Sequence, residues 1–528
     1  MGEDGAFPIL NVPGSLHVAA SGRASLSEKV IRLAPADNVA VARTDLPRGL
    51  ELVDDAGSII LRDSIGMGHK VALAALPHGG QVIKYSHVIG TALYPIQPGE
   101  WVHTHNLELD HDLDRAEFAV ERPAPPALRD DLPRHFYGFR RPDGRVGTRN
   151  HIAVVAASNC ASHVATSIAE ECRGLRLGGI DGVVALPHQE GCAHHEGPDT
   201  EQLERTIRGM ILNPNVAAVV LVGLGCEVNS LSRYAGERSI PFEVKPTHPL
   251  EIQRAGGTLK SIAEGRRMVE ELAEACSGME RTRESVEHLV LGVKCGGSDG
   301  FSGISANPAL GYAGDLLVAA GGTVVLGETP EIYGAEQVLT RRAVNEETGR
   351  RLIFIIRRFQ EYFARFGATM DSNPAPGNKR GGITNIVEKS LGAVAKGGNT
   401  MLMGVVDFAE QIACKGLIVM DTPGYDPVSI TGIAAGGCNV IGFTTGRGSA
   451  MGFPTVPVLK IASNSRIFRV MNDNMDVNAG EIVDGASTII EKGLEIYRSV
   501  VRVASGERTK SEILGHHEFS PWRIGPVV

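Results

Sequence analysis

Residues 216–229 read Val-Ala-Ala-Val-Val-Leu-Val-Gly-Leu-Gly-Cys-Glu-Val-Asn, an apolar run that leads directly into a small polar cluster. Such a run is typical of a strand that is buried on both faces of a parallel sheet. Helical patterns such as 201–211, 261–276 and 344–366 separate this run from others like it. The other runs are His151–Ala157, Gly182–Leu186, Leu289–Val293, Thr323–Leu326, Met401–Val406, Leu417–Met420, Val440–Phe443 and Val456–Ile461. This alternation predicts α/β domains with mainly parallel sheets.

The first part of the chain has a different pattern. Short strand-like runs such as Asn38–Arg43 and Gln81–Tyr85 are bounded by Gly, Pro or Asp, which predicts a small all-β domain. An acidic and then proline-rich stretch follows it, as expected of a linker, and a charged connector near residue 280 divides the remainder. The predicted division is a flexible leader at 1–23, a β domain at 24–107, a linker at 108–135, and α/β domains at 136–280 and 281–528.

Composition excludes several classes of partner. The net charge of -9 over 528 residues argues against nucleic acid, because binding phosphates requires a basic face. The longest apolar run, Val216–Leu224, is far shorter than the roughly 20 residues that span a bilayer, and the start of the chain shows no secretory signal. Eight scattered cysteines are typical of free thiols in a large intracellular protein. We therefore expect a cytoplasmic protein with no membrane or nucleic-acid partner.

Polar clusters follow the predicted strands. In an open α/β sheet, ligands bind where the carboxyl ends of the strands meet the loops, so six such clusters in succession indicate a common site. A strand-to-helix turn with a helix cap is the alternative for any one of them. The clusters are Ser158–Cys160, Pro187–Cys192, Gly223–Asn229, Lys294–Gly300, Gly327–Glu331 and Thr444–Gly448.

Cysteines and histidines in these places are candidate metal ligands. Cys160, Cys192, Cys226 and Cys295 stand at strand ends, where thiolates can bind iron or zinc, although no CxxC pair is present and each could be a small buried apolar residue instead. In the β domain, His69 precedes a strand. His103 and His105 would point to the same face of a strand and could hold one ion or one substrate; a surface pair without a role is the alternative.

Two glycine-rich segments could hold an anion. Asn373–Gly382 and Thr444–Gly448 each combine backbone N–H donors with a cation, Lys379 in the first and Arg447 in the second. This combination suits a carboxylate as well as a phosphate. Neither segment matches a Walker A or a Rossmann motif, so nucleotide binding has little support.

Several motifs resemble those of the altronate/galactarate dehydratase family. They are Lys294-Cys-Gly-Gly-Ser-Asp-Gly-Phe-Ser-Gly-Ile-Ser-Ala-Asn-Pro308, Gly223-Leu-Gly-Cys-Glu227, Asn373-Pro-Ala-Pro-Gly-Asn-Lys379 and Thr444-Thr-Gly-Arg-Gly448. The N-terminal part is similar to the SAF domain (a β-clip) of this family, with Gly68-His-Lys70 and His103-Thr-His-Asn106 at matching places. The likeness covers roughly residues 30 to 510, and it extends to altronate and to galactarate dehydratases in different segments.

The resemblance implies a hydro-lyase that converts a sugar acid, of the altronate type of hexonate, into a 2-keto-3-deoxy acid by metal-assisted removal of the C2 proton and loss of the C3 hydroxide. Its implied cofactor is Fe²⁺, with Mn²⁺ or an iron–sulfur cluster on three or four of the strand-end cysteines as alternatives. Other readings are a galactarate dehydratase, a sulfolactate-type sulfo-lyase and a non-catalytic protein that binds a sugar acid. We also expect a homo-oligomer, namely a dimer.

The candidate site residues follow from these motifs. Catalytic candidates are His69, Lys70, His103, His105, Glu227 and Asp299, with Glu328 beside them; substrate-binding candidates are Ser298, Asn307, Asn378, Lys379, Thr445 and Arg447; metal candidates are His103, His105, Cys160, Cys192, Cys226 and Cys295. The hypothesis that joins them is that the β domain closes over the α/β domains, so that all these side chains meet around one cation.

Overall fold

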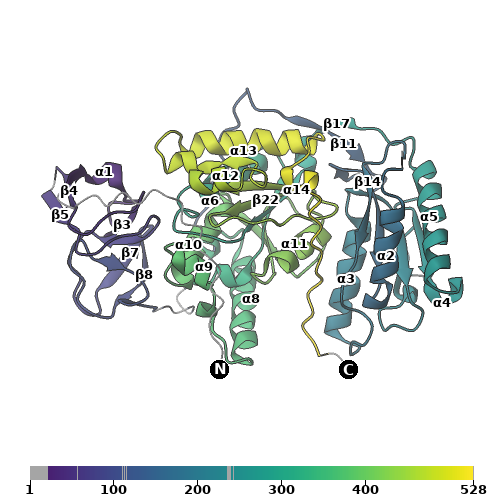
Figure 1. The fold of residues 1–528 in the computed structure, drawn as a ribbon, viewed down its shortest axis with the longest axis horizontal. Coiled ribbons are helices and arrows are strands. Elements are labelled where there is room, and N and C mark those ends of the chain that lie inside the picture. Colours follow the sequence, from purple (N-terminus) through teal and green to yellow (C-terminus); the bar gives the residue numbers. More distant parts are fainter. Residues whose placement is uncertain are drawn as a thin grey trace, which may run out of the picture.

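The computed structural model describes residues 22–526 apart from 56, 110, 112, 114, 115, 176, 235–239 and 242. Nearly all of the predicted leader, residues 1–21, lies outside the described residues. The β domain and the second domain lie at the two ends of the long axis of the molecule, and the C-terminal domain lies between them (Figure 1). Among the described residues, no helix is both long and apolar enough to cross a membrane.

The β domain consists of short strands and one helical turn, as predicted. Its three small sheets have the orders β1-β4-β5, β2-β3-β6-β9 and β10-β8-β7. The side chains of β3 are all buried. The elements are β1 (Arg23–Ser25), α1 (Leu26–Lys29), β2 (Val30–Ile31), β3 (Val39–Ala42), β4 (Glu51–Asp54), β5 (Gly57–Ile60), β6 (Lys70–Ala72), β7 (Gln81–Lys84), β8 (His87–Ala92), β9 (Trp101–Val102) and β10 (Leu107–Glu108).

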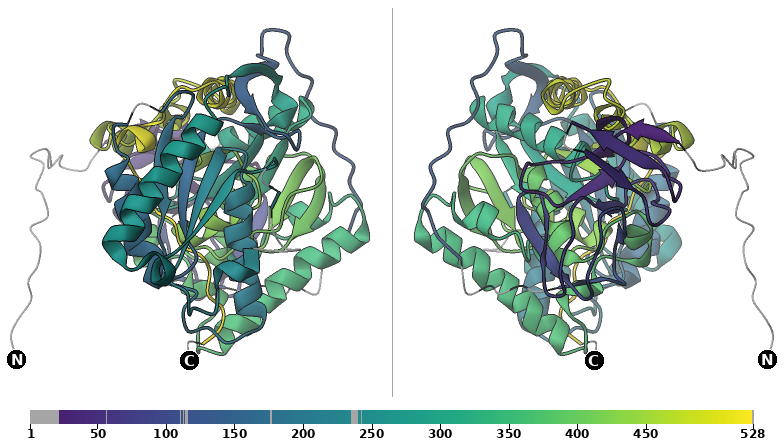
Figure 2. Two further views of the ribbon diagram at one scale, coloured as in Figure 1. Left: turned by 90° about the vertical axis from the view of Figure 1, so that its right-hand side faces the viewer. Right: turned by 90° about the vertical axis from the view of Figure 1, so that its left-hand side faces the viewer.

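The second domain is a parallel four-stranded sheet in the order β14-β13-β15-β16. All eight residues of β15 are buried, as the opening apolar run predicts. Helices α2 and α5 cover one face of the sheet, and α3 covers the other face and packs against α11 of the C-terminal domain (Figure 2). The elements are β13 (His151–Ala156), α2 (Asn159–Glu171), β14 (Gly182–Leu186), α3 (Pro198–Leu212), β15 (Val216–Gly223), β16 (Thr247–Glu251), α4 (Ile252–Ala255) and α5 (Thr258–Ala275).

The C-terminal domain is built on a parallel seven-stranded sheet in the order β20-β21-β19-β18-β22-β23-β24. Its strands are β18 (Val290–Cys295), β19 (Thr323–Leu326), β20 (Leu402–Val406), β21 (Gly416–Met420), β22 (Val440–Thr445), β23 (Val458–Ala462) and β24 (Val477–Asn478). Its helices are α6 (Ala306–Ala319), α7 (Gln337–Thr340), α8 (Glu346–Ala364), α9 (Pro376–Arg380), α10 (Ile386–Val394), α11 (Asp426–Ala435), α12 (Ser465–Val470), α13 (Ile489–Ala504) and α14 (Lys510–Ile513). Both α/β domains thus have the predicted parallel sheets.

Two connections join the domains. Residues 116–134 form no helix or strand and run along the C-terminal domain, where Ala119 donates a backbone hydrogen bond to Thr340. After them, β11 (His135–Arg140) pairs with β12 (Val146–Gly147) and with β17 (Thr282–Ser285), so the segments that enter and leave the second domain lie side by side.

Candidate active site

The loop that carries His69 lies against the C-terminal domain. Gly68 has a φ of +83°, and a Cβ built on Gly300 or on Gly382 would lie 2.0 or 2.1 Å from the Gly68 carbonyl oxygen. No side chain fits at those two positions, and glycine therefore allows the two backbones to approach. This close approach places His69 at the junction of the two domains.

An aromatic cluster surrounds His69 at this junction. The indole Nε1 of Trp101 donates to His69 Nδ1 at 3.1 Å, so the His69 Nε2 carries the proton and lies 3.2 Å from the Arg380 carbonyl oxygen. The ring of His103 lies 5.2 Å from that of His69 and 5.1 Å from that of Trp101. Both nitrogens of His69 are therefore engaged in hydrogen bonds.

His103 is the better candidate for proton transfer. It is buried, its Nδ1 lies 3.3 Å from the Thr384 hydroxyl, and no hydrogen bond to Nε2 is present among the described residues. Burial, followed by the nearby Lys70 ammonium, lowers the pKa of His103 to about 4. A neutral imidazole with one free nitrogen can accept a proton.

The prediction for His105 rested on strand geometry that the structure does not have. Strand β9 ends at Val102, and residues 103–105 form a bend and turn, so His103 and His105 do not share a strand face. His105 is exposed and its ring lies 5.0 Å from that of Trp101. The two histidines therefore contact the same indole without sharing a strand face.

A pocket opens beside these rings, with a volume of about 490 Å³. His69, Trp101 and His103 line one part of it, and Lys379 and Arg380 of α9 line another. Two cations beside a neutral imidazole suit a ligand that carries a carboxylate. Lys379 was expected from the sequence, whereas Trp101 and Arg380 were not.

Lys70 is fully buried below this pocket and is not placed to touch a ligand. Its ammonium donates to the Glu388 carboxylate at 2.8 Å and to the Gly382 carbonyl, and Lys84 donates to the other oxygen of Glu388 at 2.7 Å. Burial lowers the pKa of Lys70 to about 8, while the two lysines hold the pKa of Glu388 well below its usual range against the opposing effect of its burial. This triad, in which Glu388 comes from α10, ties the β domain to the C-terminal domain.

Asp299 makes hydrogen bonds with both of its oxygens. It accepts from Ser302 and Ser463 at Oδ1 and from Asn464 at Oδ2. Burial raises the pKa of Asp299. A Cβ on Gly446 would lie 2.2 Å from Oδ1, which leaves no room for a ligand there. Asp299 therefore fixes loops around the junction, and the only space it lines in the described cavities is a small one of about 10 Å³, shared with Ser298 and Asn307.

The other predicted substrate-binding residues form the scaffold of the same region. The amide of Asn378 donates to the Ser298 carbonyl, and that of Asn307 donates to the Gly392 carbonyl while its oxygen accepts from Thr444. The hydroxyl of Thr445 accepts from the Gly448 N–H. Arg447 is exposed, and it lies outside the pocket that Lys379 lines.

Cys295 belongs to a separate, fully buried cluster. Its Sγ lies 3.4 Å from a Glu331 oxygen and accepts from the Lys396 ammonium at 2.9 Å, and its backbone N–H donates to Glu328. Among the described residues, Cys295, Glu328 and Glu331 are the one group of three possible ligands whose atoms all lie within 4.8 Å of one another.

An iron ion fits this cluster poorly, because ammonium groups already neutralise it. Glu328 pairs with Lys294 and, at 3.1 Å, with Lys396, while Glu331 pairs with Lys389 at 2.8 Å. Burial raises the pKa of Cys295 to about 12, so the thiol keeps its proton. A divalent cation here would lie among three other positive charges.

The remaining strand-end cysteines lie in the second domain. Cys160 Sγ lies 3.8 Å from Cys192 Sγ. Burial and then the neighbouring Cys192 thiol raise the pKa of Cys160. Among the described residues, these two thiols and that of Cys226 do not all lie within 4.8 Å of one another. Glu227 accepts the Leu224 and Gly225 N–H groups and shapes the loop that carries Cys226. These cysteines lie at the far end of the molecule from the β domain (Figure 1), so the histidines and cysteines of one chain do not meet around one cation.

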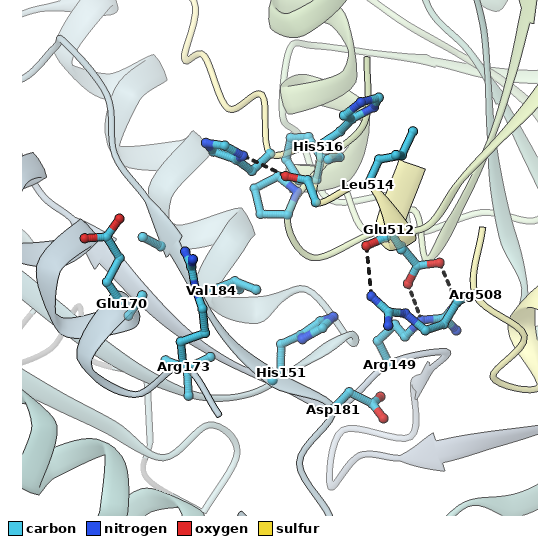
Figure 3. Close-up of a pocket in the computed structure, with 18 of the residues that line it drawn as sticks. Arg149, His151, Glu170, Arg173, Asp181, Val184, Arg508, Glu512, Leu514 and His516 are labelled. Atoms are coloured by element: carbon cyan, nitrogen blue, oxygen red, sulfur yellow. Dashed lines mark hydrogen bonds and ion pairs between the residues drawn. The ribbon is translucent and has the colours of Figure 1, made fainter. Parts of the chain in front are cut away.

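A cavity of about 750 Å³ separates the second domain from the C-terminal segment (Figure 3). Its charged residues largely pair with one another: Arg149 donates to Glu512 at 2.6 Å, Arg508 donates to the Glu512 carbonyl, and Arg281 lies 3.4 Å from Asp181. None of the candidates from the sequence lines it. We therefore assign no catalytic role to this cavity.

Comparison with known proteins shows that successive parts of the chain match models of one protein family. Residues 28–110 match the family model described as "Altronate/galactarate dehydratase SAF domain", residues 138–277 that of "D-galactarate dehydratase/Altronate hydrolase, second domain", and residues 286–527 that of "D-galactarate/Altronate dehydratase, C-terminal".

Three curated relatives extend the likeness to most of the chain. The chain is 34% identical to an altronate dehydratase of Bacillus subtilis over 94% of its own length and 99% of that protein. It is 35% identical to a galactarate dehydratase (L-threo-forming) of Escherichia coli over 94% of its length and 97% of that protein. A (2R)-sulfolactate sulfo-lyase subunit beta of Chromohalobacter salexigens is 34% identical over 74% of the chain and 98% of that subunit.

Proposed function

The chain belongs to the altronate/galactarate dehydratase family, and from that premise we propose that it is a hydro-lyase that dehydrates a sugar acid to a 2-keto-3-deoxy acid. The family models cover the β domain, the second domain and the C-terminal domain in order, and dehydratases are 34% and 35% identical over 94% of the chain. For the substrate, we propose a hexonate of the altronate type, with galactarate as the alternative.

One observation supports a catalytic role: His103 and two cationic side chains line the same pocket. Lys379 and Arg380 can hold the carboxylate of a sugar acid, and a guanidinium pairs with a carboxylate through two hydrogen bonds. Such a contact would bring the C2–H bond, next to the carboxylate, toward His103. Because its pKa is about 4, His103 is neutral at neutral pH and free to accept a proton.

The reaction then needs two bond cleavages. His103 Nε2 takes the C2 proton, the C3–O bond breaks, and the departing hydroxyl leaves as water with a proton from a general acid, after which His103 returns its proton to solvent. The resulting enol tautomerises to the 2-keto-3-deoxy acid. Binding of an anionic substrate also raises the pKa of a neighbouring imidazole, which makes His103 a stronger base in the complex than in the free enzyme.

Ferrous iron remains our proposal for the cofactor. When bound, it would stabilise the negative charge that develops on the substrate oxygens. The Cys295 cluster does not suit this role because lysines already neutralise its carboxylates. The thiols of Cys160, Cys192 and Cys226 stay candidate ligands from the sequence, but among the described residues their sulfur atoms do not all lie within 4.8 Å of one another. Thiolates would disfavour Mn²⁺, which prefers oxygen ligands.

A homodimer is the assembly that we propose, located in the cytoplasm. The β domain and the second domain of one chain lie at opposite ends of the molecule (Figure 1). A two-fold dimer in which the β domain of each chain faces the second domain of the other would bring His103 close to the cysteines.

The test is turnover on a panel of sugar acids. Protein purified without oxygen and supplied with Fe²⁺ is incubated with altronate, galactarate, other hexonates and hexarates, and sulfolactate, and 2-keto-3-deoxy acid and sulfite are measured. We expect keto-acid formation from altronate and no release of sulfite. Tight binding of sugar acids without loss of water from any of them would refute the proposal in favour of a binding protein, and sulfite release would favour the sulfo-lyase.

A further inference from the structure

The cavity between the second domain and the C-terminal segment is large enough for a small molecule. Its volume of about 750 Å³ lies within the range of about 300–1,000 Å³ that small-molecule sites have. Residues of α2 and β14 form one side of it, and residues between 506 and 517, which follow α13, form much of the other (Figure 3). A ligand in this cavity would therefore contact two domains at once.

The outer edge of β14 faces this cavity. Four consecutive residues of the strand, Gly182–Ala185, line it. Because successive side chains point to opposite faces of a sheet, a space that contacts four of them in a row lies beside the edge of the strand. β14 is the first strand of its sheet and pairs with β13, so the peptide groups on its outer edge have no strand partner among the described residues. Those N–H and C=O groups can hydrogen-bond to the hydroxyl groups of a ligand.

Two arginines at the cavity carry charges that no carboxylate of the described residues neutralises. Arg173, which follows α2, forms neither a side-chain hydrogen bond nor an ion pair with these residues. The side chain of Arg508 donates only to the backbone carbonyl of Glu512. Figure 3 shows Arg173 and Arg508 on opposite sides of the cavity. The cavity therefore has a free guanidinium on each side.

Groups that can hydrogen-bond to hydroxyls lie between the two arginines. His151 lines the cavity between them (Figure 3), and burial lowers its pKa, so its imidazole is neutral at neutral pH. Glu170 lies on the side of Arg173 and forms no ion pair with the described residues. A carboxylate accepts hydrogen bonds from hydroxyls, and a neutral imidazole both donates and accepts. Two free arginines against one free glutamate leave an excess of positive charge, which favours an anion.

We propose that this cavity binds a small polyhydroxy compound with an acidic group at each end. Arg173 holds one acidic group and Arg508 the other, and the hydroxyls between them bond to the edge of β14. Phosphates and carboxylates share this chemistry, because each pairs with a guanidinium through two hydrogen bonds. A compound with a single acidic group would leave one of the arginines without a partner.

The proposed site is separate from the pocket that His103 lines. The two have no lining residue in common. Binding here involves no chemical step, and the inference does not depend on the proposed dehydration. A ligand that contacts both the second domain and the C-terminal domain would stabilise their present arrangement, because it binds the folded chain and not the unfolded one.

Isothermal titration calorimetry of the full-length chain, in buffer without phosphate or added metal, measures this binding. Fructose 1,6-bisphosphate and galactarate are the probes with an acidic group at each end. Fructose 6-phosphate and galactonate are their counterparts with one acidic group, and sorbitol has none. Each probe is titrated into the wild type and into Arg173→Gln and Arg508→Gln. Arg254→Gln is the matched control, because Arg254 is an exposed arginine of the second domain outside the cavity.

We expect a probe with two acidic groups to bind about tenfold or more tightly than its counterpart with one. Arg173→Gln and Arg508→Gln should each remove this difference, whereas Arg254→Gln should keep it. Arg380→Met, which alters the pocket beside His103, should keep it too. The bound probe should also raise the midpoint of thermal unfolding. Tighter binding of fructose 1,6-bisphosphate would identify phosphates as the acidic groups, and tighter binding of galactarate would identify carboxylates.

Four results would overturn the inference. They are no binding of either two-acid probe at millimolar concentration, equal affinity for probes with one and two acidic groups, a difference that survives in both cavity variants, and loss of binding in Arg380→Met. None of these measurements uses turnover, so each leaves the proposed function standing. A chain that binds the probe in this cavity and dehydrates no sugar acid would refute the proposed function alone.

Discussion

Replacing Glu388 with Gln removes the one negative charge between two buried ammonium groups. The side chain of Glu388 is 1% exposed, and those of Lys70 and Lys84 are 0% and 2% exposed, with separations of 2.8 and 2.7 Å. Removing one partner of a buried ion pair costs about 3–5 kcal/mol, because the remaining charge is left without compensation. The triad joins β6 and β7 to α10, so we expect this loss in the stability of the contact between the β domain and the C-terminal domain.

The chain contains only two tryptophans, which makes this loss measurable. Trp101 lies in the β domain beside His69, so in a Trp522→Phe background its fluorescence during urea denaturation reports on the junction. Glu388→Gln should lower the free energy of unfolding measured from the Trp101 transition by about 3–5 kcal/mol. Glu264→Gln, which breaks an exposed pair with Arg267, should not move it. Replacing all three triad residues with apolar side chains of similar volume should restore most of the stability. A shift of less than about 1 kcal/mol for Glu388→Gln would refute the argument.

Three further outcomes follow from the same geometry. His103→Ala should lower kcat by about 10²-fold or more while the chain stays folded, whereas exposed His105→Ala should have a much smaller effect on kcat; equal losses would contradict the assignment. Because the pKa of His103 is about 4, the acid limb of kcat/KM should lie near pH 4 rather than near 6.5, with activity lost as pH falls through that value. Arg380→Met should raise KM for the sugar acid more than it lowers kcat, measured by initial rates at varied substrate; an unchanged KM would exclude Arg380 from carboxylate binding.

Much of the fold could be predicted from the sequence because both α/β domains bury their central strands on both faces. The run at 216–222 shows this directly, since every residue of β15 is buried. The β domain was predictable for another reason, namely that Gly, Pro and Asp punctuate its short strands. The error at His103–His105 came from extending β9 by a few residues past Val102, into a bend and turn. Strand ends are the least certain part of such a reading.

The site was harder to predict because it depends on contacts between distant segments. Nothing in the local sequence of α10 indicates that Glu388 pairs with Lys70, which lies more than 300 positions earlier. Similarly, four cysteines at strand ends look alike in sequence, and only the sheet order shows which of them follow neighbouring strands. Lys294 begins a motif that the sequence offered, but the motif does not show that Lys294 pairs with Glu328, and Lys396, which also neutralises the Cys295 cluster, lies outside the quoted motifs.

The separation of His103 from the three cysteines sets a condition on the mechanism. A base that removes the C2 proton and a metal that binds the adjacent oxygens must both contact the same small molecule, so they must lie within a few Å of it. In one chain these groups belong to domains at opposite ends of the long axis (Figure 1). If both act, each site needs two chains, and mixing inactive His103→Ala protein with inactive Cys192→Ser protein should restore activity. Random exchange gives heterodimers in about half of the molecules, each with one intact site of two, so about a quarter of wild-type activity should return. No recovery in a mixture shown to have exchanged subunits would mean that the two groups do not share a site between chains.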